Sequence, residues 1–160
     1  MSDGDALHEK WMEACIADAV QNASGDGGPF AALVVHEGRP ISRGANCVTS
    51  QLDPTAHAEI RAIRDAATAL GRFNLTGCEL FTSCEPCPMC LGAVYWARID
   101  RVYYAATRLE AAAAGFDDMR LYTELCLPTS QRSLPLVQIA TADARAPFDA
   151  WNRNSTRIPY

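Results

Sequence analysis

The sequence contains no apolar run long enough to cross a lipid bilayer, and it contains no dense cluster of lysine and arginine. Its first residues are acidic, and they lack the basic and apolar regions of a secretory signal peptide. These absences predict a cytoplasmic protein without a membrane segment. The formal net charge of −5 at pH 7 counts against a large nucleic acid as the partner, because phosphate backbones are bound by basic surfaces.

Cysteine, by contrast, is plentiful, since the 160 residues include seven. An odd number of cysteines in a reducing compartment points to metal or thiol chemistry rather than to a framework of disulfides. Three of the seven crowd into residues 84–90, whereas the other four are scattered and are expected to be small core residues. Those four are Cys15, Cys47, Cys78 and Cys126.

The length and a hydrophobic fraction of 49% suit one domain over residues 1–160. Apolar periodicity and breaker residues divide the chain into alternating helices and strands. The expected helices span residues 5–22, 56–70, 88–98, 109–114 and 119–126, with a last turn at 148–151. The expected strands span residues 30–35, 41–46, 79–82, 101–105 and 136–140. Thr55 is expected to cap the second helix, and Glu37-Gly38 to turn the first hairpin.

This order of elements predicts an α/β domain. After an initial antiparallel hairpin, helices separate the later strands, so the sheet is expected to be mostly parallel. Helices must then cover both of its faces, because a parallel sheet is buried on both sides. The expectation is a three-layer α/β/α fold around a mixed sheet of five strands.

Cys87 and Cys90 lie at a junction between an expected strand and an expected helix. Pro88 suits the first helical position, where its missing N–H group does no harm. The two cysteines are three residues apart in the first turn and project from the same side. The helix N-terminus carries partial positive charge, which favours thiolate over thiol. Two thiolates held together in this way suit a zinc ion.

His57 stands thirty residues before Cys87 (87 − 57 = 30), at the start of another expected helix. It is a natural third ligand, and three protein ligands leave a tetrahedral zinc ion with one position for water, the usual arrangement of a catalytic zinc. Glu59 lies two residues further on, so its side chain leaves the helix in a different direction. A carboxylate beside a zinc ion, but not bound to it, can accept and return protons.

Two other interpretations of these cysteines stay open at this point. Cys84, Cys87 and Cys90 would make a closed site with His57 that holds zinc for structure alone. A redox pair of Cys87 and Cys90 would need neither the histidine nor the glutamate. Both interpretations leave Glu59 without a role, and Cys84 lies on the strand side of the junction, away from the helical turn that aims the other two thiols.

His-x-Glu followed by Pro-Cys-x-x-Cys is the signature of zinc-dependent nucleobase deaminases. Further matching stretches are residues 27–30, 53–59, 82–93, 95–98 and 114–118. On these motifs, nearly the whole chain resembles the cytidine-deaminase-like superfamily. The resemblance implies a five-stranded sheet with helices on both faces, and one zinc ion on His57, Cys87 and Cys90. It leaves Cys84 off the metal.

The resemblance also implies a set of contacts with a small nucleobase. Asn46 would bind the ring of the base, and Asp118 would contact its polar edge. Phe30 and Trp96 would line the pocket. Independently of the resemblance, the start of the helix at Ala58 is expected to offer a backbone N–H group to charge that develops during reaction.

Relatives in this superfamily form a homodimer in which the C-terminal tail crosses over to the partner. By position, the tail would be residues 150–160, and Tyr160 would close the partner's site. Reach permits this, because about ten extended residues after Ala150 span roughly 33 Å.

The Gly-Phe-Asp-Asp stretch at 115–118 and a C-terminal tyrosine are closer to the guanine-deaminating branch of the superfamily. The resemblance therefore implies hydrolytic deamination of guanine to xanthine and ammonia. Guanosine, cytosine and aminotriazines stay open as related small substrates, because the sequence does not fix the size of the pocket. A tRNA adenosine deaminase would use the same motifs, but it needs a basic surface, which the acidic charge balance disfavours.

Overall fold

The computed structural model describes residues 3–116 and 118–160, so Asp117 of the Gly-Phe-Asp-Asp stretch lies outside the described residues. The chain divides into two compact units, Met1–Tyr122 and Thr123–Tyr160. Among the described residues, no helix combines the length and the apolarity that crossing a bilayer requires. That all 160 residues act as one domain remains a prediction.

The first unit is built on a sheet of four strands, β1 (Ala31–His36), β2 (Arg39–Ala45), β3 (Cys78–Cys84) and β4 (Arg101–Ala106). Their order across the sheet is β2-β1-β3-β4. β1 runs antiparallel to both β2 and β3, and β3 runs parallel to β4. The mixed character of the sheet is confirmed. β2, β3 and β4 run in the same direction, because a helix leads the chain from β2 back to the start of β3, and only β1 runs opposite to them.

The fifth expected strand was wrong. Residues 136–140 have no regular secondary structure and lie in the second unit, so within the described part of the chain β4 is an edge strand. Alternation of apolar residues records a local preference only, and a strand needs a neighbour to pair its backbone N–H and C=O groups.

A tight turn joins β1 to β2, as expected. Glu37 and Gly38 both have positive φ, at 51° and 70°. Two consecutive residues in this region make the turn whose twist matches a two-residue hairpin. β1 and β2, which follow one another in sequence, are therefore also neighbours in the sheet.

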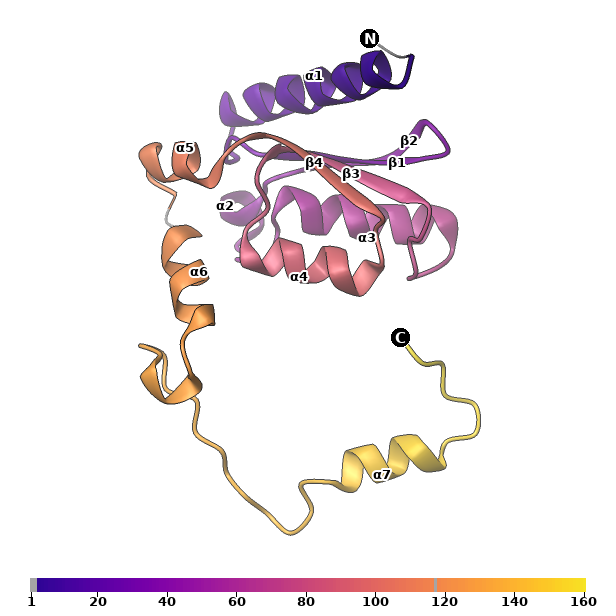
Figure 1. The fold of residues 1–160 in the computed structure, drawn as a ribbon, viewed down its shortest axis with the longest axis vertical. Helices are drawn as coiled ribbons and strands as arrows, with labels where there is room; N and C mark the ends of the chain where they lie inside the picture. The colour runs from indigo at the N-terminus through magenta and orange to yellow at the C-terminus, as the bar shows by residue number, and fades with distance from the viewer. Residues whose placement is uncertain (1–2, 117) are drawn as a thin grey trace. The chain divides into compact units, whose positions relative to one another are not determined.

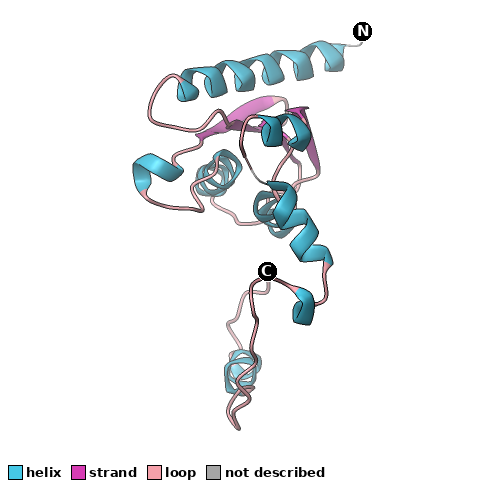
Figure 2. Ribbon diagram, turned by 90° about the vertical axis from the view of Figure 1, so that its left-hand side faces the viewer, coloured by secondary structure: helices cyan, strands magenta, loops and turns pink. Residues whose placement is uncertain are grey.

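Helices cover both faces of the sheet (Figure 1), which confirms the three-layer arrangement. α1 (Asp3–Ala23) lies on one face, and α3 (Ala58–Leu70) and α4 (Pro88–Ala97) lie on the other. Figure 2 shows the same layers from the side, with α1 running along the sheet and two helices seen nearly end-on below it. The residues that begin α3 and α4 are the ones that carry the predicted site.

Apolar side chains fill both interfaces between helix and sheet. On the α1 side, Met12 packs with Phe81 and Leu33 of the strands. On the other side, small residues of α3 such as Ala62 let the helix lie close to the sheet, where it packs with Leu80. These buried layers fix the ends of α3 and α4 relative to the strands, which is what places the site.

Four shorter α-helices and a 3₁₀ turn complete the structure. They are α2 (Val48–Gln51), α5 (Arg108–Ala113), α6 (Asp118–Cys126), the 3₁₀ turn at Thr129–Gln131, and α7 (Ala146–Arg153). α2 lies in a stretch for which neither a helix nor a strand was expected. α5 begins with a capping box in which Thr107 and Glu110 bond each other's backbone N–H groups.

The predicted cap at Thr55 was wrong. α3 begins later, and its N-cap is His57. The amide and the hydroxyl of Thr55 instead donate to the Asp53 carboxylate, at 2.8 and 2.7 Å. Aspartate competes for nearby backbone N–H groups in this way at turns, and that turn delays the start of the helix by two residues.

Candidate active site

Two helix N-termini carry the predicted metal ligands. His57 is the N-cap residue of α3 and Cys87 is that of α4, and both have extended backbone conformations. Pro88 opens α4, as expected, and Cys90 lies in its first turn. Because an N-cap residue sits half outside its helix, each side chain can turn toward the space between the two helix starts.

The three predicted ligands come together there. The Nδ1 atom of His57 lies 3.6 Å from the sulfur of Cys87 and 3.5 Å from that of Cys90. The three ligand atoms all lie within 4.8 Å of one another. A tetrahedral zinc ion, with bonds of about 2.3 Å to sulfur and about 2.0–2.1 Å to nitrogen, separates those two atoms by about 3.5 Å. The donor set and its spacing therefore fit zinc.

Electrostatics within the cluster also suit a cation. A hydrogen bond from Cys90 lowers the pKa of the Cys87 thiol to about 4. The hydrogen bond with Cys87 raises the pKa of Cys90, and it raises that of the His57 imidazole as well. Negative charge thus settles first on Cys87, and a thiolate is the form of cysteine that binds metal.

Cys84 faces different surroundings. Its sulfur contacts the carbonyl oxygen of Thr107 at 3.7 Å, and burial raises the pKa of its thiol to about 11. Among the described residues, the only metal-binding cluster consists of His57, Cys87 and Cys90, without Cys84. A neutral thiol outside the cluster does not complete a closed site of three sulfurs and one nitrogen.

Glu59 is buried next to this cluster, with 6% of its surface exposed. Burial raises the pKa of its carboxyl group, and that group is hydrogen-bonded to the Cys90 thiol. The Thr82 hydroxyl donates to Oε1 of Glu59 at 3.5 Å. A buried carboxyl whose uncharged form is favoured can hold a proton and release it to a nearby group.

A cavity of about 310 Å³ opens onto Glu59 and two of the ligands. This volume is at the lower end of the range for small-molecule sites. The lining residues come from both helix starts, the loops around β1 and β2, and the segment before α6. They are Gly28, Phe30, Asn46, Val48, Thr49, His57, Glu59, Cys84, Glu85, Cys87, Phe116 and Asp118.

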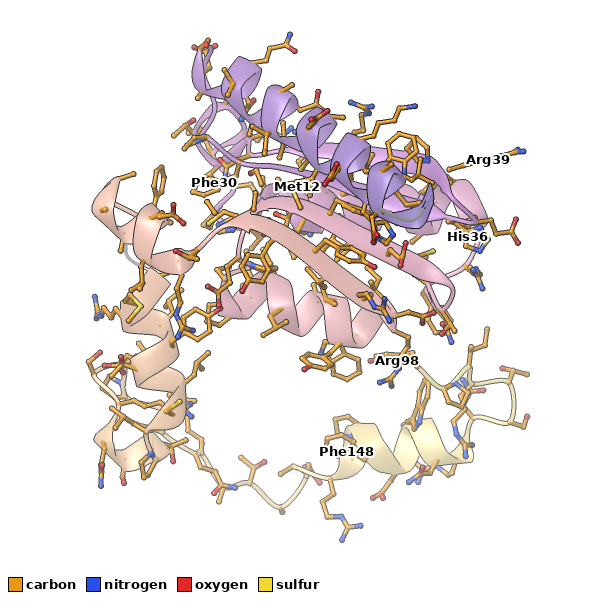
Figure 3. The ribbon with its side chains drawn as sticks, turned by 45° about the horizontal axis from the view of Figure 1, so that its top comes forward. Met12, Phe30, His36, Arg39, Arg98 and Phe148 are labelled. Atoms are coloured by element: carbon orange, nitrogen blue, oxygen red, sulfur yellow. The ribbon has the colours of Figure 1, made fainter. Side chains whose placement is uncertain are left out.

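Two of the predicted substrate contacts lie side by side in this cavity. The N–H group of Asn46 donates to the carbonyl oxygen of Phe30 at 3.0 Å. The ring of Phe30 meets the edge of Phe116, with ring centroids 4.7 Å apart. Figure 3 labels Phe30 and His36 at opposite ends of β1, which places the cavity at the end where β1 begins.

Comparison with protein families gives an independent result. Residues 5–106 match the family model described as the cytidine and deoxycytidylate deaminase zinc-binding region. This stretch contains all three candidate ligands and Glu59. The chain belongs to this deaminase family.

Particular relatives extend the match beyond the zinc region. Guanine deaminase of Bacillus subtilis is 46% identical over 96% of this chain and 99% of its own. The crystal structure of guanine deaminase from the same organism matches with a TM-score of 0.93, at 45% identity, over 96% of this chain and 98% of its own. A tRNA-specific adenosine deaminase of Agrobacterium fabrum is 43% identical, but over only 60% of this chain and 63% of its own.

Apart from the metal ligands, three of the residues predicted for the deaminase site do not line the described cavity. Trp96 does not line the described cavity, and its side chain is 65% exposed on α4. Ala58 is fully buried at the first position of α3 and does not line the cavity either. Tyr160 belongs to the second unit, where its ring meets the edge of Trp151 at 6.4 Å.

Further contacts attach the loop between β3 and α4, which contains Glu85 and Pro86, to the helices that follow. Glu85 accepts the N–H group of Arg108 at 3.1 Å, and the two side chains form an ion pair at 3.6 Å. The Tyr122 hydroxyl donates to the carbonyl oxygen of Pro86 at 2.6 Å. These bonds hold the segment that carries Phe116 against the start of α4.

Sequence reasoning missed several of these residues. Glu85 and Phe116 lay within the matching stretches and were available as signals, although no role was assigned to them. Thr82 also lay within a matching stretch without an assigned role, whereas Asn22 gave no local signal. Asn22 lies on α1, and it reaches the site only through hydrogen bonds to residues 6 and 24 positions away.

Proposed function

We propose that this deaminase hydrolyses guanine to xanthine and ammonia in a zinc-dependent reaction. The observation that carries the proposal is the buried carboxyl group of Glu59 beside a three-ligand cluster, at the base of a small cavity. Its support is the 46% identity to Bacillus subtilis guanine deaminase over nearly the whole chain. Tetrahedral zinc with three protein ligands keeps one position for water, as hydrolysis requires.

In this proposal, His57, Cys87 and Cys90 hold one zinc ion. When bound, the ion supplies a Lewis acid that makes water nucleophilic near neutral pH. The negative charge on Cys87 and the adjacent imidazole would hold the cation, and Glu59 lines the same cavity as these two ligands. The closed alternative with Cys84 finds no support, because its thiol contacts Thr107 instead.

Glu59 moves the protons. It accepts a proton from the water that attacks C2 of guanine and delivers it to N3 of the ring. Glu59 next takes the proton of the hydroxyl group now attached to C2 and passes it to the amino group at C2. The C–N bond then breaks and ammonia leaves as the C2 carbonyl forms, so that guanine and water yield xanthine and ammonia. Burial suits this carboxyl group to proton transfer, because it raises the pKa and so favours the protonated form more than bulk water does.

Residues at the mouth and walls of the cavity hold the base. We propose that Phe30 packs on the ring, that Asn46 binds its polar atoms, and that Asp118 contacts the opposite edge, since all three line the cavity. The backbone at Ala58 and the indole of Trp96 remain predicted contacts. A cavity of about 310 Å³ favours a free base over a polynucleotide.

We further propose that the protein acts in the cytoplasm as a homodimer, with residues 150–160 crossing to the partner so that Tyr160 closes its site. Several apolar side chains of the second unit are exposed in the single chain, which supports a partner surface that covers them. They are Leu134, Leu136, Val137, Ile139, Phe148 and Ile158.

Release of ammonia tests the proposed substrate. The zinc-loaded protein would be incubated separately with guanine, guanosine, adenine, cytosine and ammeline, and with a tRNA that carries a wobble adenosine. We expect rapid release from guanine and little from the others. A preference for any other compound, or inosine in the tRNA, would replace guanine in the proposal.

A further inference from the structure

Asn22, in the last turn of α1, reaches the loops that form one wall of the cavity. Its side-chain amino group donates two hydrogen bonds, one to the carbonyl oxygen of Gly28 at 2.7 Å and one to that of Asn46 at 2.9 Å. Both acceptors belong to residues that line the cavity. One side chain outside the cavity thus joins two separate segments of its wall.

Those two segments carry the proposed contacts with the base. The first leads from Gly28 to Phe30, and the second is Asn46, which follows β2. The Asn46 side-chain oxygen accepts the N–H group of Val48 at 3.3 Å, which sets the direction of its carboxamide. Because the Asn46 N–H group also bonds the carbonyl oxygen of Phe30 at 3.0 Å, a shift of either segment moves the other.

Close packing at Gly27 reinforces the connection. A Cβ atom at this position would lie 2.3 Å from the amino nitrogen of Asn22 and 2.5 Å from the carbonyl oxygen of Asn46. Both distances are far below van der Waals contact. The loop at Gly27 therefore lies against the two hydrogen bonds, with no room for a side chain at this position.

We propose that Asn22 is a positioning residue for substrate recognition, which acts by holding Phe30 and Asn46 at the spacing that a purine ring requires. The proposal rests on the proposed function, because that is where Phe30 and Asn46 are assigned to the base. Asn22 does not line the cavity, and it lies on α1, whereas the ligands and Glu59 lie at the starts of α3 and α4. It therefore affects how the base is bound more than how the proton is moved.

Asn22→Asp is the sharpest variant, because it keeps the shape of the side chain and replaces the donor with an acceptor that faces two carbonyl oxygens. We expect KM for guanine to rise about tenfold or more, as the loss of two partly buried hydrogen bonds implies. We expect kcat to change less than about threefold, and zinc content to stay at the wild-type level. Asn22→Ala should raise KM less, because it removes the donor without adding repulsion.

Gln21→Ala is the matched control. It truncates the neighbouring residue of the same helix, which is exposed and does not line the cavity. We expect wild-type kinetics for this variant. Thermal unfolding of all three proteins separates a loss of fold from a loss of recognition, and should Asn22→Asp prove unfolded, Asn22→Ala decides the matter.

Combination with Asn46→Ala tests whether Asn22 acts through that residue. If it does, Asn22→Ala should raise KM far less in the Asn46→Ala background than in the wild type, because coupled residues are non-additive. Equal effects in both backgrounds, or a fall in kcat at unchanged KM, would overturn the proposal. Absence of guanine turnover in the wild type would instead overturn the proposed function, so the two failures are distinguishable.

Discussion

Cys84 and Cys87 are three residues apart, yet their thiols have opposite character. The Cys87 thiol accepts a hydrogen bond from Cys90 and has a pKa of about 4, whereas burial raises the pKa of Cys84 to about 11. The difference follows from position, because Cys84 is the last residue of β3, whereas Cys87 is the N-cap residue of α4. Only one of the two is therefore suited to a metal.

This contrast predicts different effects of the same substitution. Cys84→Ser should still bind about one zinc ion per chain and should keep most activity, because three ligands suffice for a catalytic site. Cys87→Ser should lose most of its zinc. Metal analysis of the purified variants checks this, and equal loss of zinc from both would support a closed site that includes Cys84.

At this scale the sequence was a good guide where the motif was short. His57, Cys87, Cys90 and Glu59 were predicted because each stands at the start of a helix, where local sequence sets direction. The sequence did not predict residues whose role depends on distant partners. Asn22 is one of them, because its hydrogen-bond acceptors lie elsewhere in the chain. Such contacts arise only once the chain has folded.

Among the elements, the approach of β2 to α3 decides where the site lies. A Cβ atom on Gly44 would lie 2.1 Å from the carbonyl oxygen of Ala58 and 2.7 Å from the backbone nitrogen of Ala62. Glycine at this position therefore lets the strand touch the first turn of the helix that carries Glu59. Because backbone atoms make the contact, no side chain can rotate away to make room.

Gly44→Ala should accordingly destabilise the protein by about 1–3 kcal/mol or more, as overpacking does, and it should also weaken zinc binding by displacing α3. Gly92→Ala is the control, since a Cβ atom there meets nothing within 4 Å. In a helix interior that change should be neutral or stabilising by up to about 1 kcal/mol. Urea unfolding of both variants decides the point, and equal stabilities would contradict the packing described.

Most elements of the first unit were predicted from the sequence, because apolar periodicity, Pro88 and the glycine turns act locally. The cap at Thr55 failed, since the Asp53 carboxylate accepts both the backbone N–H group and the hydroxyl group of Thr55. The strand at 136–140 failed for a different reason. The apolar pattern of these residues suits a strand, but a strand needs an adjacent strand for backbone pairing, and the local sequence does not determine whether one is present.

On the scale of the whole molecule, the order of the strands across the sheet was harder to predict than their existence. β1 lies between β2 and β3 and is antiparallel to both, because the helix between β2 and β3 crosses over β1 and makes β3 parallel to β2. Sequence pattern shows that a crossover exists, but the order of strands across the sheet depends on packing of the complete domain. Residues near β1 and residues near β3 nevertheless meet at one cavity.

The proposed exchange of tails between protomers can be tested by complementation. Glu59→Gln removes the proton carrier, and Tyr160→Ala removes the residue proposed to close the partner's site. Each variant should be nearly inactive alone. After unfolding and refolding together, mixed dimers should contain one intact site, so activity should return to about a quarter of wild type, given random pairing of a symmetric dimer. No recovery would contradict the exchange.

In the proposed reaction, Glu59 moves protons beside a bound zinc ion during hydrolysis of guanine. The most direct measurement is ammonia release from guanine by Glu59→Gln and by the wild type, each with its zinc content determined in the same sample. We predict equal zinc, and turnover lower in the variant by at least about 100-fold, as expected for loss of a general acid–base group. Comparable turnover at equal zinc content would contradict the account.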